Sequence, residues 1–167
     1  MTKALLVIDM QNVCVGEKHA SFFKYDNKKL ISNVNDVINK NKDNHVFYIQ
    51  NVMKNNFINK LAPVKAFDGT EEIELVKEQN VISDNIYKKY EGNAFSNPDF
   101  KAKLISLNVD EVELVGLDGG GCIAKTALGA INEGYKVIIN QKAIGTMFEK
   151  KANKLNKKLK QLGASFI

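Results

Sequence analysis

The sequence predicts an α/β fold of three layers, in which a mainly parallel sheet of about six strands has helices on both faces, in a Rossmann-like arrangement. The continuous apolar run at residues 4–8 is typical of a strand that is buried on both faces, and the mainly apolar stretch 112–115 indicates another strand. Segments with apolar residues at helical spacing, such as 28–42 and 148–162, lie between these runs. Strands that alternate with helices of this length form parallel sheets through crossover connections.

The first half of the chain predicts two strands, a long helix and a long loop. Residues 28–42 form an amphipathic helix, because their apolar residues recur every three or four positions. Residues 46–49 are apolar and form the second strand. Residues 51–70 form a loop, because Asn-Asn, Pro and Asp-Gly interrupt regular structure there. An acidic first turn after a threonine predicts a short helix at 71–77.

The second half of the chain repeats the alternation of strands and helices. Two short apolar pieces, 81–82 and 86–87, precede a helix that begins at Pro98, since proline is favoured in the first helical turn. Gly134 and Gly163 mark the ends of two later helices. The remaining predicted elements are a strand at 112–115, a helix at 123–133, a strand at 135–139, a helix at 148–162 and an edge strand at 164–167.

Length and composition predict one domain over residues 1–167, with an ordinary globular share of 44% hydrophobic residues. The net charge of +5 comes from scattered lysines, and the densest cluster, at 150–160, lacks interleaved aromatic residues. That cluster therefore favours a solvated helix face over nucleic-acid binding. No apolar run reaches the ~18 residues of a membrane span, and no signal peptide is visible. We expect a cytoplasmic protein with neither a nucleic-acid nor a membrane partner.

The stretch 112–127 carries most of the chemical information. Its apolar strand runs into the glycines 119–121, and Cys122 stands where a helix begins. The first N–H groups of a helix have no partner within it, so they favour a thiolate and can hold an oxyanion. The pattern predicts a nucleophilic cysteine with a lowered pKa. A buried structural cysteine, or a glycine loop that holds an anion at the helix start, also fits the pattern.

Two charged residues follow other predicted strands. Asp9 comes directly after the run 4–8, and Lys89, or its neighbour Lys88, comes after the piece 86–87. The carboxyl ends of parallel strands meet at one edge of a sheet, where ligands bind. Asp9, Lys89 and Cys122 are therefore predicted to share one cleft. A cap on the following turn, or an ion pair with a nearby lysine, is the alternative role for Asp9.

Three motifs built on these residues resemble the isochorismatase-like cysteine hydrolases, a superfamily that includes nicotinamidases and N-carbamoylsarcosine amidohydrolases. The motifs occur in order over nearly the whole chain, and they are 6–12, Lys89 with 93–95, and 116–127 followed by 134–137. The resemblance implies that Asp9, Lys89 and Cys122 form a catalytic triad. It further implies an oxyanion hole made by the backbone N–H groups of Asp118 and Cys122, a cis peptide bond before Asp118, and substrate contacts at Gln11, Phe95 and Gly119.

The resemblance also implies acyl transfer to Cys122 from a small amide, ureido or related C–N substrate through a thioester. An isochorismatase-type vinyl-ether hydrolase and an inactive relative that binds an anion are the alternatives. The family loop usually carries Thr or Ser and then a polar residue where this chain has Gly119 and Gly120.

We expect no cofactor and no bound metal, because the loop 51–70 contains no histidine and the two histidines, His19 and His45, lie elsewhere. The partners implied are a small-molecule substrate and further copies of the chain, as a dimer or tetramer. The two cysteines, Cys14 and Cys122, leave a disulfide open, although a reduced protein is favoured.

Overall fold

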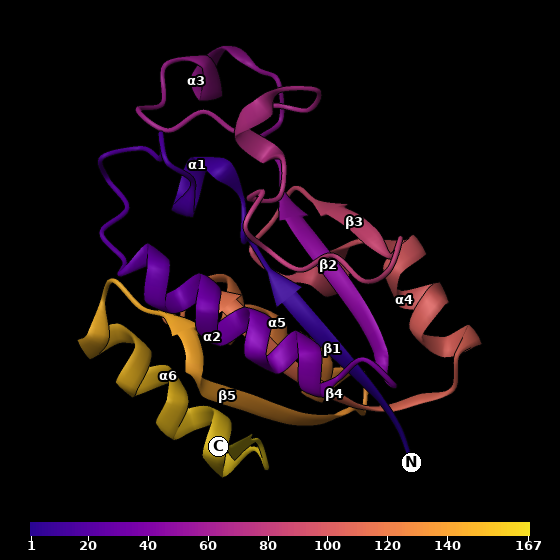
Figure 1. The fold of residues 1–167 in the computed structure, drawn as a ribbon. Helices are drawn as coiled ribbons and strands as arrows, with labels where there is room; N and C mark the ends of the chain where they lie inside the picture. Colours follow the sequence, from indigo (N-terminus) through magenta and orange to yellow (C-terminus); the bar gives the residue numbers. More distant parts are fainter.

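A computed structural model describes residues 1–167 and confirms the α/β fold (Figure 1). The core of the molecule is a six-stranded sheet in the order β3-β2-β1-β4-β5-β6. Every neighbouring pair of strands is parallel. The strands are β1 (Thr2–Ile8), β2 (His45–Asn51), β3 (Ile86–Lys89), β4 (Val109–Leu117), β5 (Lys136–Gly145) and β6 (Ser165–Phe166).

Helices cover both faces of the sheet. Buried side chains of α1 and α2 pack on one face, together with residues of the segment that joins β2 to β3. Buried side chains of α4, α5 and α6 pack on the other face. The helices are α1 (Asn12–Val15), α2 (Asn27–Lys40), α3 (Phe57–Lys60), α4 (Pro98–Ser106), α5 (Cys122–Asn132) and α6 (Glu149–Gln161), with 3-10 turns η1 (Glu71–Ile73) and η2 (Ala94–Ser96).

The sheet is built from the apolar runs that the sequence marks. Residues 4–8 and 112, 114 and 115 are fully buried, as expected for central strands with helices on both faces. The predicted helices at 28–42, 123–133 and 148–162 are confirmed as α2, α5 and α6. None of the helices combines the length and the apolar composition that a membrane crossing requires.

One local prediction between β2 and β3 is wrong. The predicted helix at 71–77 ends after η1, because the chain then pairs with the segment that follows β1: Gln11 forms an antiparallel bridge with Leu75, and the Val76 N–H donates to the Met10 carbonyl. The short apolar piece 81–82 lies outside the sheet, and both its side chains are nearly half exposed. The strand begins only at Ile86.

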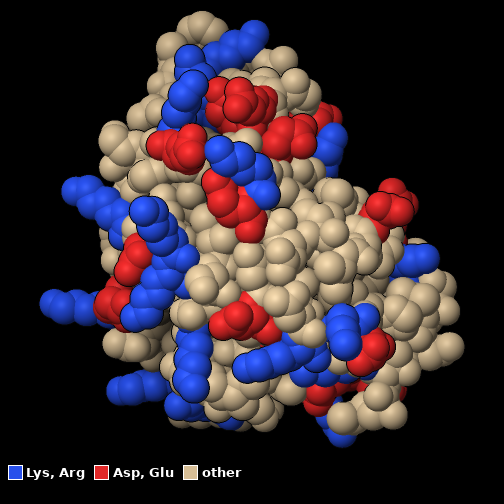
Figure 2. Space-filling model, in the orientation of Figure 1, with Lys and Arg blue, Asp and Glu red and all other residues tan.

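Basic and acidic side chains lie intermixed on the face of the molecule that Figure 2 shows. Surface ion pairs are few, and one of them joins Lys101 to Glu133 at 2.6 Å. No patch of a single sign covers this face.

Gly116 allows the close approach of β1 and β4 beside Asp9. Its φ is 106°, and a Cβ at this position would overlap the carbonyl oxygen of Ile8. Gly134 has a similar φ of 91°, but a Cβ there would meet no atom within 4 Å. The two glycines therefore share a backbone conformation and differ in the room that is available for a side chain.

This pair makes a matched stability test. Gly134→Ala places a side chain in the left-handed region and should cost about 1–2 kcal/mol. Gly116→Ala adds overpacking between two central strands and should cost about 1–3 kcal/mol more. Urea unfolding of both variants measures the difference. Equal losses would show that contact with Ile8 does not require the glycine.

Candidate active site

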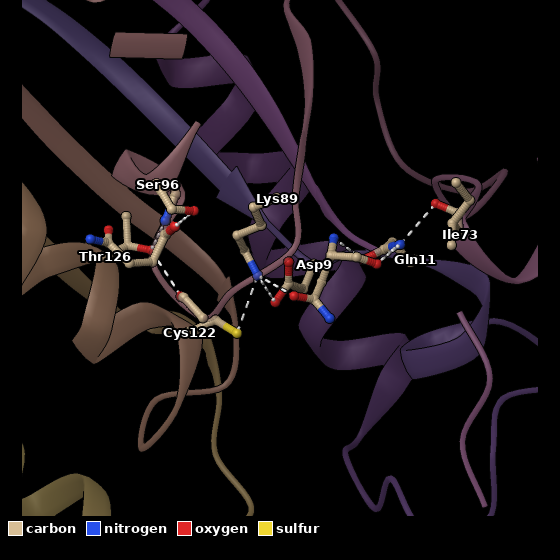
Figure 3. Close-up of polar contacts among 11 residues, drawn as sticks. Asp9, Gln11, Ile73, Lys89, Ser96, Cys122 and Thr126 are labelled. Atoms are coloured by element: carbon tan, nitrogen blue, oxygen red, sulfur yellow. Dashed lines mark hydrogen bonds and ion pairs between the residues drawn. The ribbon is translucent and has the colours of Figure 1, made fainter. Parts of the chain in front are cut away.

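Three chain segments bring polar side chains together at the carboxyl edge of the sheet (Figure 3). Asp9 follows β1, Lys89 is the last residue of β3, and Cys122 is the first residue of α5. The parallel topology places these ends at one edge, as predicted. Lys89 occupies the site and Lys88 does not: Lys88 is exposed and pairs with Asp68 at 2.6 Å.

The Lys89 ammonium group is the centre of the site. It donates to Asp9 Oδ2 at 3.0 Å, to Asn51 Oδ1 at 2.9 Å and to Cys122 Sγ at 3.3 Å. These bonds use all three of its N–H groups. The Lys89 side chain is 0% exposed. Burial lowers the pKa of Lys89, but Asp9 and the thiol outweigh burial and leave the pKa raised, so the group stays charged.

Asp9 is held in an uncommon backbone conformation with φ 56°. Its N–H donates to the Ile49 carbonyl at 2.9 Å, which joins it to β2. One carboxylate oxygen accepts from Lys89, and the other, Oδ1, is buried and makes no hydrogen bond. This second oxygen is available to accept a proton.

The structure reverses the predicted direction of the Cys122 pKa. Burial, followed by the negative charge of Asp9, raises the pKa of Cys122 to about 12, although Lys89 opposes the change. Burial therefore outweighs the helix start, which is worth at most about 2 kcal/mol. The thiol is protonated at neutral pH. Both cysteines are free, and burial raises the pKa of Cys14 as well.

The loop before Cys122 is closed by hydrogen bonds to Asp118. The Asp118 carbonyl accepts from the N–H groups of Gly121 and Ile123. Its carboxylate accepts from Gly120 N–H at 2.9 Å, Met147 N–H at 2.8 Å and Tyr25 OH at 3.2 Å. Asp118 thus fixes the loop against the end of β5 and against the segment before α2.

The predicted cis peptide bond before Asp118 is wrong, because the chain contains no cis peptide bond. A non-proline cis bond costs about 3 kcal/mol, and three successive glycines let the chain turn without it. The N–H groups of Asp118 and Cys122 make no hydrogen bond within the chain. The oxyanion hole that the resemblance implies at these two N–H groups stays a prediction.

The structure gives Gln11 and Phe95 positions that differ from the predicted substrate contacts. Gln11 is fully buried, and its amide binds the Asn51 backbone on both sides, at 2.8 Å and 3.1 Å. Phe95 is buried in the core, 5.3 Å from the Phe100 ring centroid. Both residues support the site from behind, because neither has a free surface. Gly119 lies in the loop, and its N–H donates to the Gly145 carbonyl.

Two residues of the site were not predicted. The Asn51 side chain accepts a hydrogen bond from Lys89. Its position in the sequence could have marked it, because a polar residue ends β2, and that residue lies opposite Lys89 in the register of β2 with β3. Thr126 lies one turn after Cys122, and its buried hydroxyl accepts from the Ala94 N–H at 3.0 Å. This bond fixes α5 against η2.

No group of three or more His, Cys, Asp or Glu side chains is arranged to hold a metal ion. His19 contacts the Gly16 carbonyl at 2.8 Å, and His45 is the first residue of β2. The ionisable side chains that meet at the site are those of Asp9, Lys89 and Cys122.

Comparisons with known proteins extend this description. The chain is 26% identical over 149 residues to the uncharacterized isochorismatase family protein YddQ of Bacillus subtilis, a match that covers 87% of the chain and 79% of the relative. Its fold is similar to an isochorismatase-like hydrolase from Alkaliphilus metalliredigens (TM-score 0.85, 24% identity, 99% of this chain and 93% of that one).

Two further solved structures share the fold. They are nicotinamidase from Bacillus subtilis (TM-score 0.85, 24% identity, 99% of each chain) and N-carbamoylsarcosine amidase from Thermoplasma acidophilum (TM-score 0.83, 21% identity, 99% of this chain and 95% of that one). The family model described as the isochorismatase domain matches residues 3–167. Since this model spans almost the whole sequence, the chain belongs to the isochorismatase family, whose members include hydrolases of small molecules.

Proposed function

We propose that this protein is a cysteine hydrolase that cleaves a small amide, ureido or related C–N substrate, with Asp9, Lys89 and Cys122 as its catalytic residues. The observation that carries the proposal is the Lys89 ammonium group, which bonds to both the Asp9 carboxylate and the Cys122 sulfur. Nicotinamidase and N-carbamoylsarcosine amidase, which have the same fold, support the substrate class.

The first half of the reaction forms a thioester. Asp9 takes the thiol proton as Cys122 Sγ attacks the carbonyl carbon. The resulting oxyanion accepts hydrogen bonds from the N–H groups of Asp118 and Cys122, each worth about 3 kcal/mol in the transition state. Protonated Asp9 then gives its proton to the leaving nitrogen, and the C–N bond breaks.

The second half of the reaction returns the enzyme to its starting state. A water molecule attacks the thioester carbon and gives its proton to Asp9. The tetrahedral intermediate collapses, the C–S bond breaks, and the sulfur takes back the proton from Asp9. The products are a carboxylic or carbamic acid and the amine or ammonia released earlier.

The raised pKa of Cys122 fits general-base catalysis rather than a preformed thiolate. A thiol that is protonated at rest needs a base within reach, and Asp9 Oδ1 has no other hydrogen-bond partner. Lys89 contacts both groups, so it stabilises the negative charge on the carboxylate before the attack and on the sulfur during it.

We infer from the resemblance to the family that the chain also assembles as a dimer or tetramer. Sedimentation velocity at micromolar concentration measures this state, and one chain per particle at every concentration would contradict it.

Turnover is tested by screening nicotinamide, N-carbamoylsarcosine and other small amides for ammonia release. Cys122→Ala and Asp9→Asn should each lower kcat by roughly 10³-fold or more, because each removes a group that acts in the chemical step. Lys89→Met should behave alike, whereas Lys88→Met, at the neighbouring exposed lysine, should keep full activity. Undiminished C–N hydrolysis by Cys122→Ala would refute the proposal. Hydrolysis of a vinyl ether such as isochorismate by that variant would identify the alternative activity.

Thiol alkylation separates the base from the nucleophile. In the wild type, the rate of Cys122 labelling by iodoacetamide should still rise above pH 9, since its pKa is raised to about 12. Asp9→Asn removes the charge that helps to raise this pKa, so the profile should move to lower pH and labelling at pH 8 should become about tenfold faster. The same variant should lose turnover. Peptide mass spectrometry, with Cys122→Ala as the unlabelled control, measures the rates. Slower labelling of Asp9→Asn at pH 8 would contradict the assignment of Asp9.

A further inference from the structure

One exposed lysine lies on the helix face that carries the thiol. Lys125 follows Cys122 by three residues in α5, so the two side chains are neighbours on one face of the helix. Helical side chains lean toward the N-terminus, and the Lys125 side chain therefore covers the turn that begins at Cys122.

The Lys125 side chain is directed across the segment that follows β3. Its Nζ lies 3.0 Å, and its Cε 3.3 Å, from the position that a Cβ of Gly92 would take. Gly92 comes three residues after Lys89, and the Thr126 hydroxyl faces the carbonyl of Gly92 at 3.5 Å. The absence of a side chain at Gly92 leaves room for the aliphatic stem of Lys125. The ammonium group is thus placed between α5 and the segment that carries Lys89.

The charge of Lys125 is unpaired within the chain. Lys125 is exposed and makes neither an ion pair nor a hydrogen bond, and Glu91, beside Gly92 in sequence, forms no ion pair with it. The Lys89 ammonium differs, because its three N–H groups already bond to side chains of the protein. Lys125 can therefore bind a ligand's negative charge, and Lys89 cannot.

We propose that Lys125 is a specificity-determining residue that favours substrates with a carboxylate or similar anionic group near the scissile C–N bond. The inference rests on the proposed function in one respect, that Cys122 is the reacting group. A ligand whose electrophilic carbon lies at Cys122 Sγ would place a nearby carboxylate within reach of the Lys125 ammonium. A neutral ligand of the same shape would gain nothing from it.

The test compares two reagents that differ in charge and react at the same sulfur. Iodoacetate is anionic and iodoacetamide is neutral, so the ratio of their rate constants with Cys122 reports the local charge, and changes in thiol pKa cancel. Lys125→Gln should lower the ratio of iodoacetate to iodoacetamide about two- to fivefold at low salt, as expected for one exposed ion pair. Lys125→Arg should keep it, and so should Lys151→Gln, an exposed lysine of α6 with no ion pair.

Several outcomes would overturn the proposal. An unchanged ratio in Lys125→Gln would do so, as would an equal loss in Lys151→Gln. Salt should reduce the wild-type ratio, because it screens an exposed charge, and a ratio independent of salt would also count against Lys125. Failure of both reagents to label Cys122 would overturn this proposal and the proposed function together.

A turnover arm separates the two proposals. It compares kcat/KM for N-carbamoylglycine with kcat/KM for its neutral amide, in the wild type and in Lys125→Gln. Lys125→Gln should lower kcat/KM for the acid alone by about two- to fivefold. If C–N hydrolysis is absent while the alkylation ratio still falls, the proposed function fails and the role of Lys125 in anion binding stands. If hydrolysis occurs with equal losses for both compounds, the role of Lys125 fails.

Discussion

The site depends on the buried ammonium group of Lys89, each of whose N–H groups needs a hydrogen-bond acceptor. An unpaired charge in the interior costs several kcal/mol or more, so Lys89 requires acceptors in fixed places. The three acceptors belong to Asp9, Asn51 and Cys122, which come from the ends of β1 and β2 and from the turn after β4. The order β3-β2-β1-β4, with all strands parallel, brings these ends to the last residue of β3. The topology of the sheet therefore supplies the acceptors that the buried charge of Lys89 needs.

The same burial decides where the negative charge of the site resides. Two anions beside one ammonium would leave an excess buried charge, and the raised pKa of Cys122 reflects this. The thiol, whose pKa is raised, keeps its proton at rest. In the proposed attack, the proton moves to Asp9 and the charge moves to sulfur. Lys89 contacts both groups, so the ammonium remains paired during the transfer.

The sequence predicted the features that depend on local pattern. Continuous apolar runs identified the central strands, and the strand-to-helix turn identified the cysteine. Features that depend on burial were not predictable. The helix at 71–77 has a strong local signal, but pairing between Leu75 and Gln11 overrides it. A motif does not distinguish residues that touch a ligand from those that hold the backbone behind it, so Gln11 and Phe95 were assigned to the substrate. The direction of the thiol pKa depended on burial, which outweighs the helix start.

The long segment between β2 and β3 is connected to Lys89 by hydrogen bonds. The Ile73 carbonyl accepts from the side-chain amides of Gln11 at 3.0 Å and Gln50 at 2.9 Å. Gln11 also holds the backbone of Asn51, and Asn51 in turn holds Lys89. A continuous chain of hydrogen bonds thus runs from this irregular segment to the ammonium group. Because Gln11 and Gln50 are buried, displacement of Ile73 would leave two buried amides without an acceptor. Ile73 of this segment therefore helps to fix the position of Lys89.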